Sequence, residues 1–434
     1  MTDQTDAQLA AQYEAFPYPR RDPREEAKRL IVGSPGHLRE IDHWVFGATR
    51  PAIVPLRALI AGGGSGDATI MLAQQMAREG RAGTVTWLDR SSAALKVAQA
   101  RAAARGLTNI VWEQRSLLDL PGSGLGPYDY VDCCGVLHHL PDPEAGVRAL
   151  LSVLAPGGGM GLMVYAPHGR TGIYMVQDGL RLLAPPDQEP EARLDVARRV
   201  MKHLPETAWL RANRSVSDHL NGGDAGLYDL LLNPRDRAYT VPALHDLLAA
   251  AGLSIRCWVE PIRYDPMPLL PDARLRARIA TLTPLERAAL AESLSGNIAA
   301  HIIYCTRTAE PPVRADPFSQ DAIPTWRETD GEQLAKGIQA NNTLFVGLDA
   351  LRVSVALPPM ATSIVRLIDG KRSVGEIGAL LAARGTSAEA FTRTWQALFP
   401  ALEGINRLLL AAPGASPAGA TVGAPVPGVP PAAA

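Results

Sequence analysis

The residues best suited to chemistry follow the ends of short apolar runs. The loop GGGSG, at 62–66, comes directly after the run LRALIA. Asp89 ends the next apolar run, and His138 and His139 follow a later one. Glycine lets a ligand approach the backbone closely because it has no Cβ. An acid after the second strand can accept both ribose hydroxyls, and imidazole can take a proton near neutral pH. The pattern predicts a nucleotide-type ligand beside a candidate base.

The glycine spacing discriminates between two cofactors. A dinucleotide motif G-x-G-x-x-G that started at Gly62 would need a third glycine where Asp67 stands. One that started at Gly64 would need it at Thr69. The spacing present is G-x-G-x-G, through Gly66, and a carboxylate at the helix start competes with pyrophosphate for the helix N-terminus. We therefore expect S-adenosylmethionine, which has no phosphate.

Apolar runs and helical stretches alternate around these residues. The expected helices cover 67–79, 92–105 and 142–154. The expected strands cover 56–61, 84–89, 109–113, 128–134, 159–165, 253–259 and 298–306. Such alternation predicts an α/β fold with a seven-stranded, mostly parallel, doubly wound sheet. Ligands of such sheets bind at the carboxyl ends of the strands, where the residues above would meet.

The ordered motifs resemble those of class I S-adenosylmethionine-dependent methyltransferases. They are ALIAGGGSG, WLDRS, RSLLDLP, YDYVDCCGVLHHLPDP and LAPGGGMGLMVYA, over roughly 55–170. The resemblance returns at 238–307 with TVPALHDLLAAAGL. It implies a methyl-transferring enzyme whose glycine loop contacts the methionine part of the cofactor and whose Asp89 contacts the ribose. A methyltransferase fold that only binds is the alternative.

Two positions depart from the family pattern. The family often has an acid two residues before its first glycine, where this chain has Ile60. It often has Asp after the third strand, where this chain has Ser116, whose hydroxyl can still bond the adenine amino group. Leu117 and Cys134 complete the expected cofactor contacts. Asp67 is the candidate to replace the missing acid.

We expect the residues that contact the methyl acceptor to follow strands four and five. His138 or His139 is the candidate general base, although the pair could instead cap a helix or line the cofactor site. We expect no metal site, because adjacent histidines point apart and no cluster has ligand spacing. The candidate substrate contacts are Tyr18, Tyr165, His168, Arg170 and Tyr174. The alternative for the last four is a solvated loop.

The chain divides into several expected segments. A lid with Tyr13, Phe16 and Tyr18 and a helix around 23–45 occupies 1–50, although its aromatic residues could instead pack on the sheet edge. The methyltransferase domain covers 51–307, with a helical cap at 175–237 and a helical insert at 267–296. A proline-rich linker (308–339), a small α+β domain (340–412) and an uncharged, disordered tail (413–434) follow.

The segment ATSIVRLIDGKRSVGEIGALLAARG resembles small winged-helix domains related to the peptide-chaperone family of quinone-cofactor biosynthesis. The resemblance implies protein or peptide contact through 340–412. Residues 341–412 contain only two more basic than acidic side chains, which is too little charge to favour nucleic acid.

The overall composition argues against several kinds of partner and location. The formal net charge is −1, so neither nucleic acid nor an anionic membrane is an expected partner. The four cysteines form no C-x-x-C pair, and no signal peptide or membrane span is apparent, which predicts a cytoplasmic protein. For the methyl acceptor we rank a small molecule above a peptide side chain and nucleic acid last.

Overall fold

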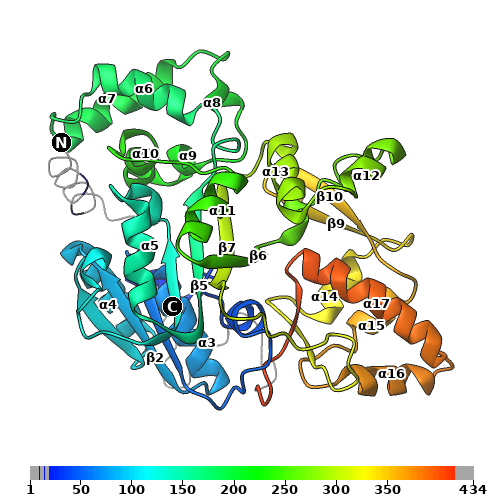
Figure 1. Ribbon diagram of the computed structural model, residues 1–434. Helices are drawn as coiled ribbons and strands as arrows, with labels where there is room; N and C mark the ends of the chain where they lie inside the picture. Colours follow the sequence, from blue (N-terminus) through cyan, green and yellow to red (C-terminus); the bar gives the residue numbers. More distant parts are fainter. Residues whose placement is uncertain (1–8, 10–13, 15–18, 416–434) are drawn as a thin grey trace, which may run out of the picture.

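A seven-stranded sheet forms the centre of the protein, seen in a computed structural model that describes residues 9, 14 and 19–415 (Figure 1). The strand order is β3-β2-β1-β4-β5-β7-β6, and β7 alone is antiparallel to its neighbours, which confirms the predicted sheet. The strands are β1 (Leu56–Ala61), β2 (Gly83–Asp89), β3 (Ile110–Gln114), β4 (Tyr128–Cys134), β5 (Leu154–Tyr165), β6 (Leu253–Trp258) and β7 (Ala300–Arg307).

Helices cover both faces of this sheet. Successive side chains of a strand point to opposite faces, so Leu59 packs with the apolar sides of α5 and α11, and Ile60 with that of α3. The helices are α3 (Asp67–Glu79), α4 (Ser92–Ala104), α5 (Pro143–Ser152) and α11 (Val241–Ala250). Tight turns join strands to helices at the carboxyl ends of β1, β2 and β4, where the predicted site residues lie.

The predicted cap and insert are both helical. The cap lies over the carboxyl ends of the strands, shown in green in Figure 1, and has its own apolar core. Its helices are α6 (Ile173–Leu183), α7 (Pro190–His203), α8 (Trp209–Ala212), α9 (Asp218–Asn221) and α10 (Gly223–Leu232). The insert forms α12 (Ala273–Ile279) and α13 (Pro284–Ser295), and Thr283 and Glu286 form the capping box that their spacing predicts.

The C-terminal module packs around a separate apolar core. It contains β8 (Pro324–Trp326), α14 (Gly331–Gly337), β9 (Thr343–Leu348), β10 (Leu351–Ala356), α15 (Ala361–Val365), α16 (Val374–Ala382), α17 (Ala388–Gly404) and β11 (Leu408–Leu410). β8 pairs with β11, so the module begins inside the predicted linker 308–339. Ser387 caps α17, because its hydroxyl accepts from the Ala390 amide.

The segment before the sheet is not the continuous helix that was expected over 23–45. It has a 3-10 turn at Pro23–Ala27, α2 (Leu38–Glu40) and a π turn at Ile41–Val45. Pro35 and Gly36, which has φ +96°, interrupt it. Tyr13, Phe16, Tyr18 and nearly all of the predicted tail lie outside the described residues. Within residues 9, 14 and 19–415, no helix has the length and apolarity that a bilayer crossing requires.

Candidate active site

A cavity of about 790 Å³ opens at the carboxyl ends of the strands. Its walls come from the glycine loop, the ends of β2, β4 and β5, the turn after β3, the cap and the segment before the sheet. This volume lies in the ordinary range for small-ligand sites, about 300–1,000 Å³. The cavity therefore lies where the order of the strands predicts a ligand site.

The glycine loop is closed onto β2. The amides of Gly62 and Gly63 both donate to the carbonyl oxygen of Leu88, at 2.7 and 2.9 Å. Gly62 has φ +83°, and a Cβ there would lie 2.2 Å from Cγ2 of Val136. Gly64, with φ +47°, and Gly66, with φ +99°, also adopt left-handed conformations that favour glycine. The three alternate glycines thus stand at the three positions of the loop where the backbone is left-handed.

Asp89 is among the residues that line the cavity. Its Oδ2 accepts from the Gly64 amide at 2.9 Å, and its Oδ1 accepts from the Ser91 amide at 3.0 Å. Glu14, which no sequence motif singles out, lies close to Asp89. It accepts hydrogen bonds from Ser91 Oγ at 2.7 Å and from Ser92 Oγ, and these bonds lower its pKa. The segment before the sheet thus reaches the start of α4 beside Asp89.

Asp67 also lines the cavity, but its carboxylate is already paired. Its Oδ2 lies 2.5 Å from the guanidinium of Arg21, and its Oδ1 lies 2.6 Å from that of Arg101. Burial alone would raise the pKa of Asp67, but the two cations outweigh it and lower the pKa. Asp67 therefore braces the segment before the sheet against α4 and is a poor replacement for an acid at Ile60.

The remaining predicted cofactor residues converge on the cavity. Ser116, Leu117 and Cys134 all line it, and so does Ile60. Ser116 Oγ accepts from the Leu118 amide at 3.2 Å and starts the 3-10 turn at Leu117–Asp119. Burial raises the pKa of the Cys134 thiol, which keeps it protonated.

The two predicted histidines occupy different places. His139 lines the cavity, and its Nδ1 lies 2.6 Å from the carbonyl oxygen of Arg235. His138 is not among the cavity-lining residues, and neither of its ring nitrogens has a hydrogen-bond partner in the described structure. Burial lowers the pKa of His138 well below its ordinary value, so its ring stays neutral beside Tyr165. Of the two histidines, His139 alone lines the cavity.

Arg170 and Tyr165 both line the cavity and contact each other. The Arg170 guanidinium lies 3.7 Å from the centroid of the Tyr165 ring and 2.6 Å from the carboxylate of Asp236. Tyr174 supports Arg170 from outside the cavity lining, and His168 is exposed away from it. Arg235, the neighbour of Asp236 in sequence, donates to the His139 carbonyl oxygen at 3.3 Å. Tyr18 lies outside the described residues.

Two acids of the cap that line the cavity were also missed by sequence reasoning. Asp229 and Asp218 come from the cap and line the cavity near Tyr165, whose hydroxyl lies 3.4 Å from Asp229 Oδ2. Both belong to the cap, and the helical pattern of its sequence does not indicate that the cap lies over the sheet. No group of three or more His, Cys, Asp or Glu side chains in the described ranges could hold a metal ion.

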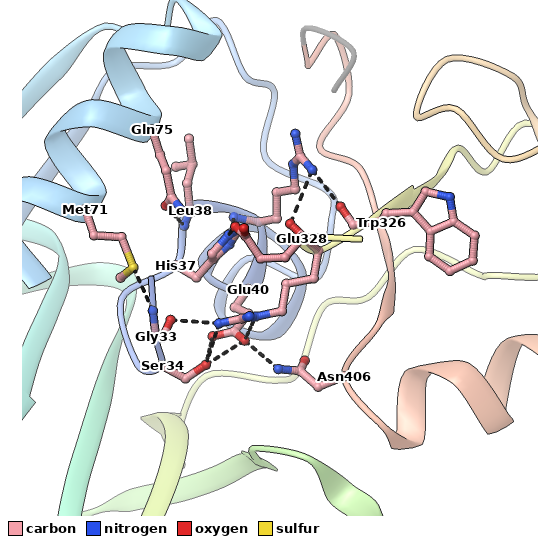
Figure 2. A network of polar contacts seen from close by, with 12 residues as sticks. Gly33, Ser34, His37, Leu38, Glu40, Met71, Gln75, Trp326, Glu328 and Asn406 are labelled. Carbon is pink, nitrogen blue, oxygen red and sulfur yellow. Dashed lines mark hydrogen bonds and ion pairs between the residues drawn. The ribbon is translucent and has the colours of Figure 1, made fainter. Parts of the chain in front are cut away.

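The C-terminal module contacts the segment before the sheet at Glu40, which is the last residue of α2 (Figure 2). Glu40 is fully buried and forms an ion pair with Arg327, which also donates to the Gly33 carbonyl oxygen at 2.7 Å. Its other donors are Ser34, Tyr304 and Asn406. Burial alone would raise the pKa of Glu40, but Arg327, His37 and the hydrogen bonds from Tyr304 and Ser34 outweigh it and lower the pKa. Because Gly33 and Ser34 line the cavity, the module holds part of its wall in place.

Fold and site together define a Rossmann-like domain for a nucleotide-containing cofactor, and comparison with known proteins narrows the class. The family model described as "Methyltransferase domain" matches residues 59–160. "Uncharacterized protein syc1184_c" from Synechococcus sp. is 30% identical over 323 residues, which cover 72% of this chain and 74% of that protein. This chain belongs to the class I S-adenosylmethionine-dependent methyltransferases.

Two further similarities concern a shorter region and the fold. "Ubiquinone biosynthesis O-methyltransferase" from Escherichia coli O9:H4 is 29% identical over 152 residues, which cover 35% of this chain and 60% of that protein. The structure of PKMT2 from Rickettsia typhi in complex with AdoHcy superimposes with a TM-score of 0.62 at 13% identity, and covers 87% of this chain and 75% of that one. Because the superposition covers 87% of this chain, the fold that the two proteins share includes elements outside the central sheet.

Proposed function

We propose that this methyltransferase transfers the methyl group to a hydroxyl oxygen of a small molecule, with His139 as the general base. The position of the His139 ring carries the proposal. Its Nδ1 lies 2.6 Å from the Arg235 carbonyl oxygen, which can only accept a hydrogen bond. The neutral ring therefore carries its proton on Nδ1. Nε2 is left with the lone pair that can remove a proton from a hydroxyl.

The cofactor end of the cavity matches the chemical groups of S-adenosylmethionine. The cofactor supplies a methyl group activated by a sulfonium, so the protein mainly has to align two reactants. The loop at 62–66 would hold the methionine part, and Ser116 with Leu117 the adenine. Asp89 would accept the ribose hydroxyls, because each of its oxygens accepts one backbone hydrogen bond and has a further lone pair.

A valine at Gly64 should weaken cofactor binding. Gly64 lines the cavity with φ +47°, so a β-branched side chain there both strains the loop and occupies ligand space. We expect about 10- to 100-fold weaker binding of S-adenosylhomocysteine by calorimetry in Gly64→Val. Gly106→Val is the matched control, because Gly106 has φ +64° but nothing within 4 Å of a Cβ. Unchanged affinity in Gly64→Val, or equal losses in both variants, would contradict the assignment.

The acceptor end favours a small ligand. The cap residues Val216 and Asp218 and the segment before the sheet contribute walls on either side of the cavity. Arg170, held by Asp236, and the Tyr165 ring offer a fixed surface against which an acceptor can be oriented. The name of the Escherichia coli relative, an O-methyltransferase of ubiquinone biosynthesis, supports a hydroxyl acceptor. A peptide side chain remains the second choice, and protein or peptide contact through 340–412 is a separate proposal.

Methyl-transfer assays with labelled cofactor on a metabolite extract test this choice. We expect the label in small molecules, and we expect transfer to stop when the identified hydroxyl is already methylated. An amine analogue of that acceptor should accept methyl poorly. Label found only in protein, or transfer that survives blocking of every hydroxyl, would refute the proposal.

A further inference from the structure

An acid stands beside the apolar position Ile60, on the neighbouring strand. β1 and β4 are parallel, and the register pairs Ile60 directly with Asp132. The two side chains therefore point to the same face of the sheet at the same level. Both line the cavity, next to Met71 and Cys134. Asp132 thus occupies nearly the place from which an acid at position 60 would act.

The Asp132 carboxylate is only half satisfied. Its Oδ2 accepts from the Tyr130 hydroxyl at 2.8 Å, whereas its Oδ1 has no hydrogen-bond partner within the described part of the chain. The side chain is fully buried and forms no ion pair with any described residue. Gly36 packs over it, since a Cβ at Gly36 would lie 2.9 Å from Oδ2. A buried, half-paired carboxyl group is costly to maintain, which points to a partner that arrives with a ligand.

We propose that Asp132 binds the ammonium group of the methionine part of S-adenosylmethionine, in place of the acid missing at Ile60. The inference rests on the cofactor and is independent of the acceptor proposed above. An ammonium offers three donors and a positive charge, which would satisfy Oδ1 and neutralise the carboxylate. Asp67 cannot take this role equally well, because Arg21 and Arg101 already pair with it.

The pH dependence follows from the surroundings of Asp132. Burial raises its pKa to about 7, against the opposing effect of the Tyr130 hydrogen bond. The other titratable groups around it are Tyr130 and Cys134 on β4, Tyr304 on β7, and Glu40 behind Tyr304. Burial raises the pKa of both tyrosines and of Cys134, so they stay protonated, while Glu40 stays ionised. Below about pH 7 the Asp132 carboxyl group is mostly protonated. A cation binds only its ionised form, so binding in that range releases the Asp132 proton.

Calorimetry with two ligands tests the inference without turnover. S-Adenosylhomocysteine has the amino-acid part, and 5′-methylthioadenosine lacks it. In the wild-type protein we expect affinity for the first ligand to rise with pH from 6 to 8, by up to about tenfold per unit at the acid end, with proton release measured in two buffers. Affinity for the second ligand should change much less. A pH-independent ratio of the two affinities would overturn the proposal without any variant.

The variant Asp132→Asn keeps the size and the Tyr130 contact but removes the charge. We expect it to bind S-adenosylhomocysteine about 10- to 100-fold more weakly at pH 8, and 5′-methylthioadenosine normally. Adding Ile60→Asp to this variant should recover part of the loss, because it restores an acid at the adjacent position. Equal losses for both ligands would indicate a structural role and contradict the proposal, as would no loss. An acceptor other than a hydroxyl would leave these results unchanged.

Discussion

Replacing His139 by alanine should lower kcat by about 10²- to 10⁴-fold, which is the usual contribution of a general base. The expected loss follows from the tautomer set by the Arg235 carbonyl oxygen, which leaves Nε2 as the proton acceptor. Affinity for S-adenosylhomocysteine should stay within about threefold, because a tenfold change would need a lost contact worth about 1.4 kcal/mol. Steady-state kinetics with the acceptor that the labelling assay finds, together with calorimetry, measure both quantities.

Two controls separate proton transfer from a packing defect at His139. His168→Ala should leave kcat unchanged, since that histidine is exposed outside the cavity lining. Added imidazole should restore part of the activity of His139→Ala, because a free base can enter the space left by the ring. A small loss in kcat, or a large loss that imidazole does not rescue, would exclude His139 as the base.

Replacing Arg327 by methionine should destabilise the protein by about 3–5 kcal/mol, because it leaves Glu40 charged, buried and without its cation. Urea or thermal unfolding measures the loss. Arg366→Met is the matched control in the same module: its ion pair with Glu332 is solvent-exposed, so the loss should be under about 1 kcal/mol. Similar losses in the two variants would refute a special role for the Glu40 network.

The pH dependence of that loss has a definite sign. In the wild-type protein the pKa of Glu40 is lowered, so the network stabilises the fold above the ordinary glutamate range and weakens as pH falls through the folded-state pKa. Without Arg327, burial raises the pKa of Glu40, and protonation relieves the buried charge. The difference between the variant and the wild type should therefore shrink as pH is lowered from 7 toward 4.

The Arg327 variant should also bind cofactor more weakly. Arg327 donates to the Gly33 carbonyl oxygen and to Ser34 Oγ, and both residues line the cavity. Loss of these bonds frees a piece of the wall about 290 residues away in sequence from Arg327. The expected effect is weaker binding of S-adenosylhomocysteine at a temperature where the variant is still folded. Normal affinity there would show that the module stabilises the fold without shaping the site.

Local pattern was enough to predict most of the sheet and the cofactor. The run at 128–134 and the run at 56–61 match β4 and β1 in their bounds, because each predominantly apolar run ends directly before a glycine. The glycine spacing indicated S-adenosylmethionine because Asp67 and Thr69 stand where a dinucleotide loop would need its third glycine. The helix expected at 23–45 was wrong, because Pro35 and Gly36 interrupt an otherwise helical composition.

The sequence by itself determined the cofactor, the parallel sheet and the strand ends that carry Asp89 and His139. Only the tertiary structure decided that His139 and not His138 lines the cavity, that Asp67 is bound by two arginines, and that Asp132 stands beside Ile60. The physical reason is distance along the chain. Glycine turns and apolar periodicity act over a few residues, whereas strand register, burial and ion pairs join residues that are far apart in the sequence.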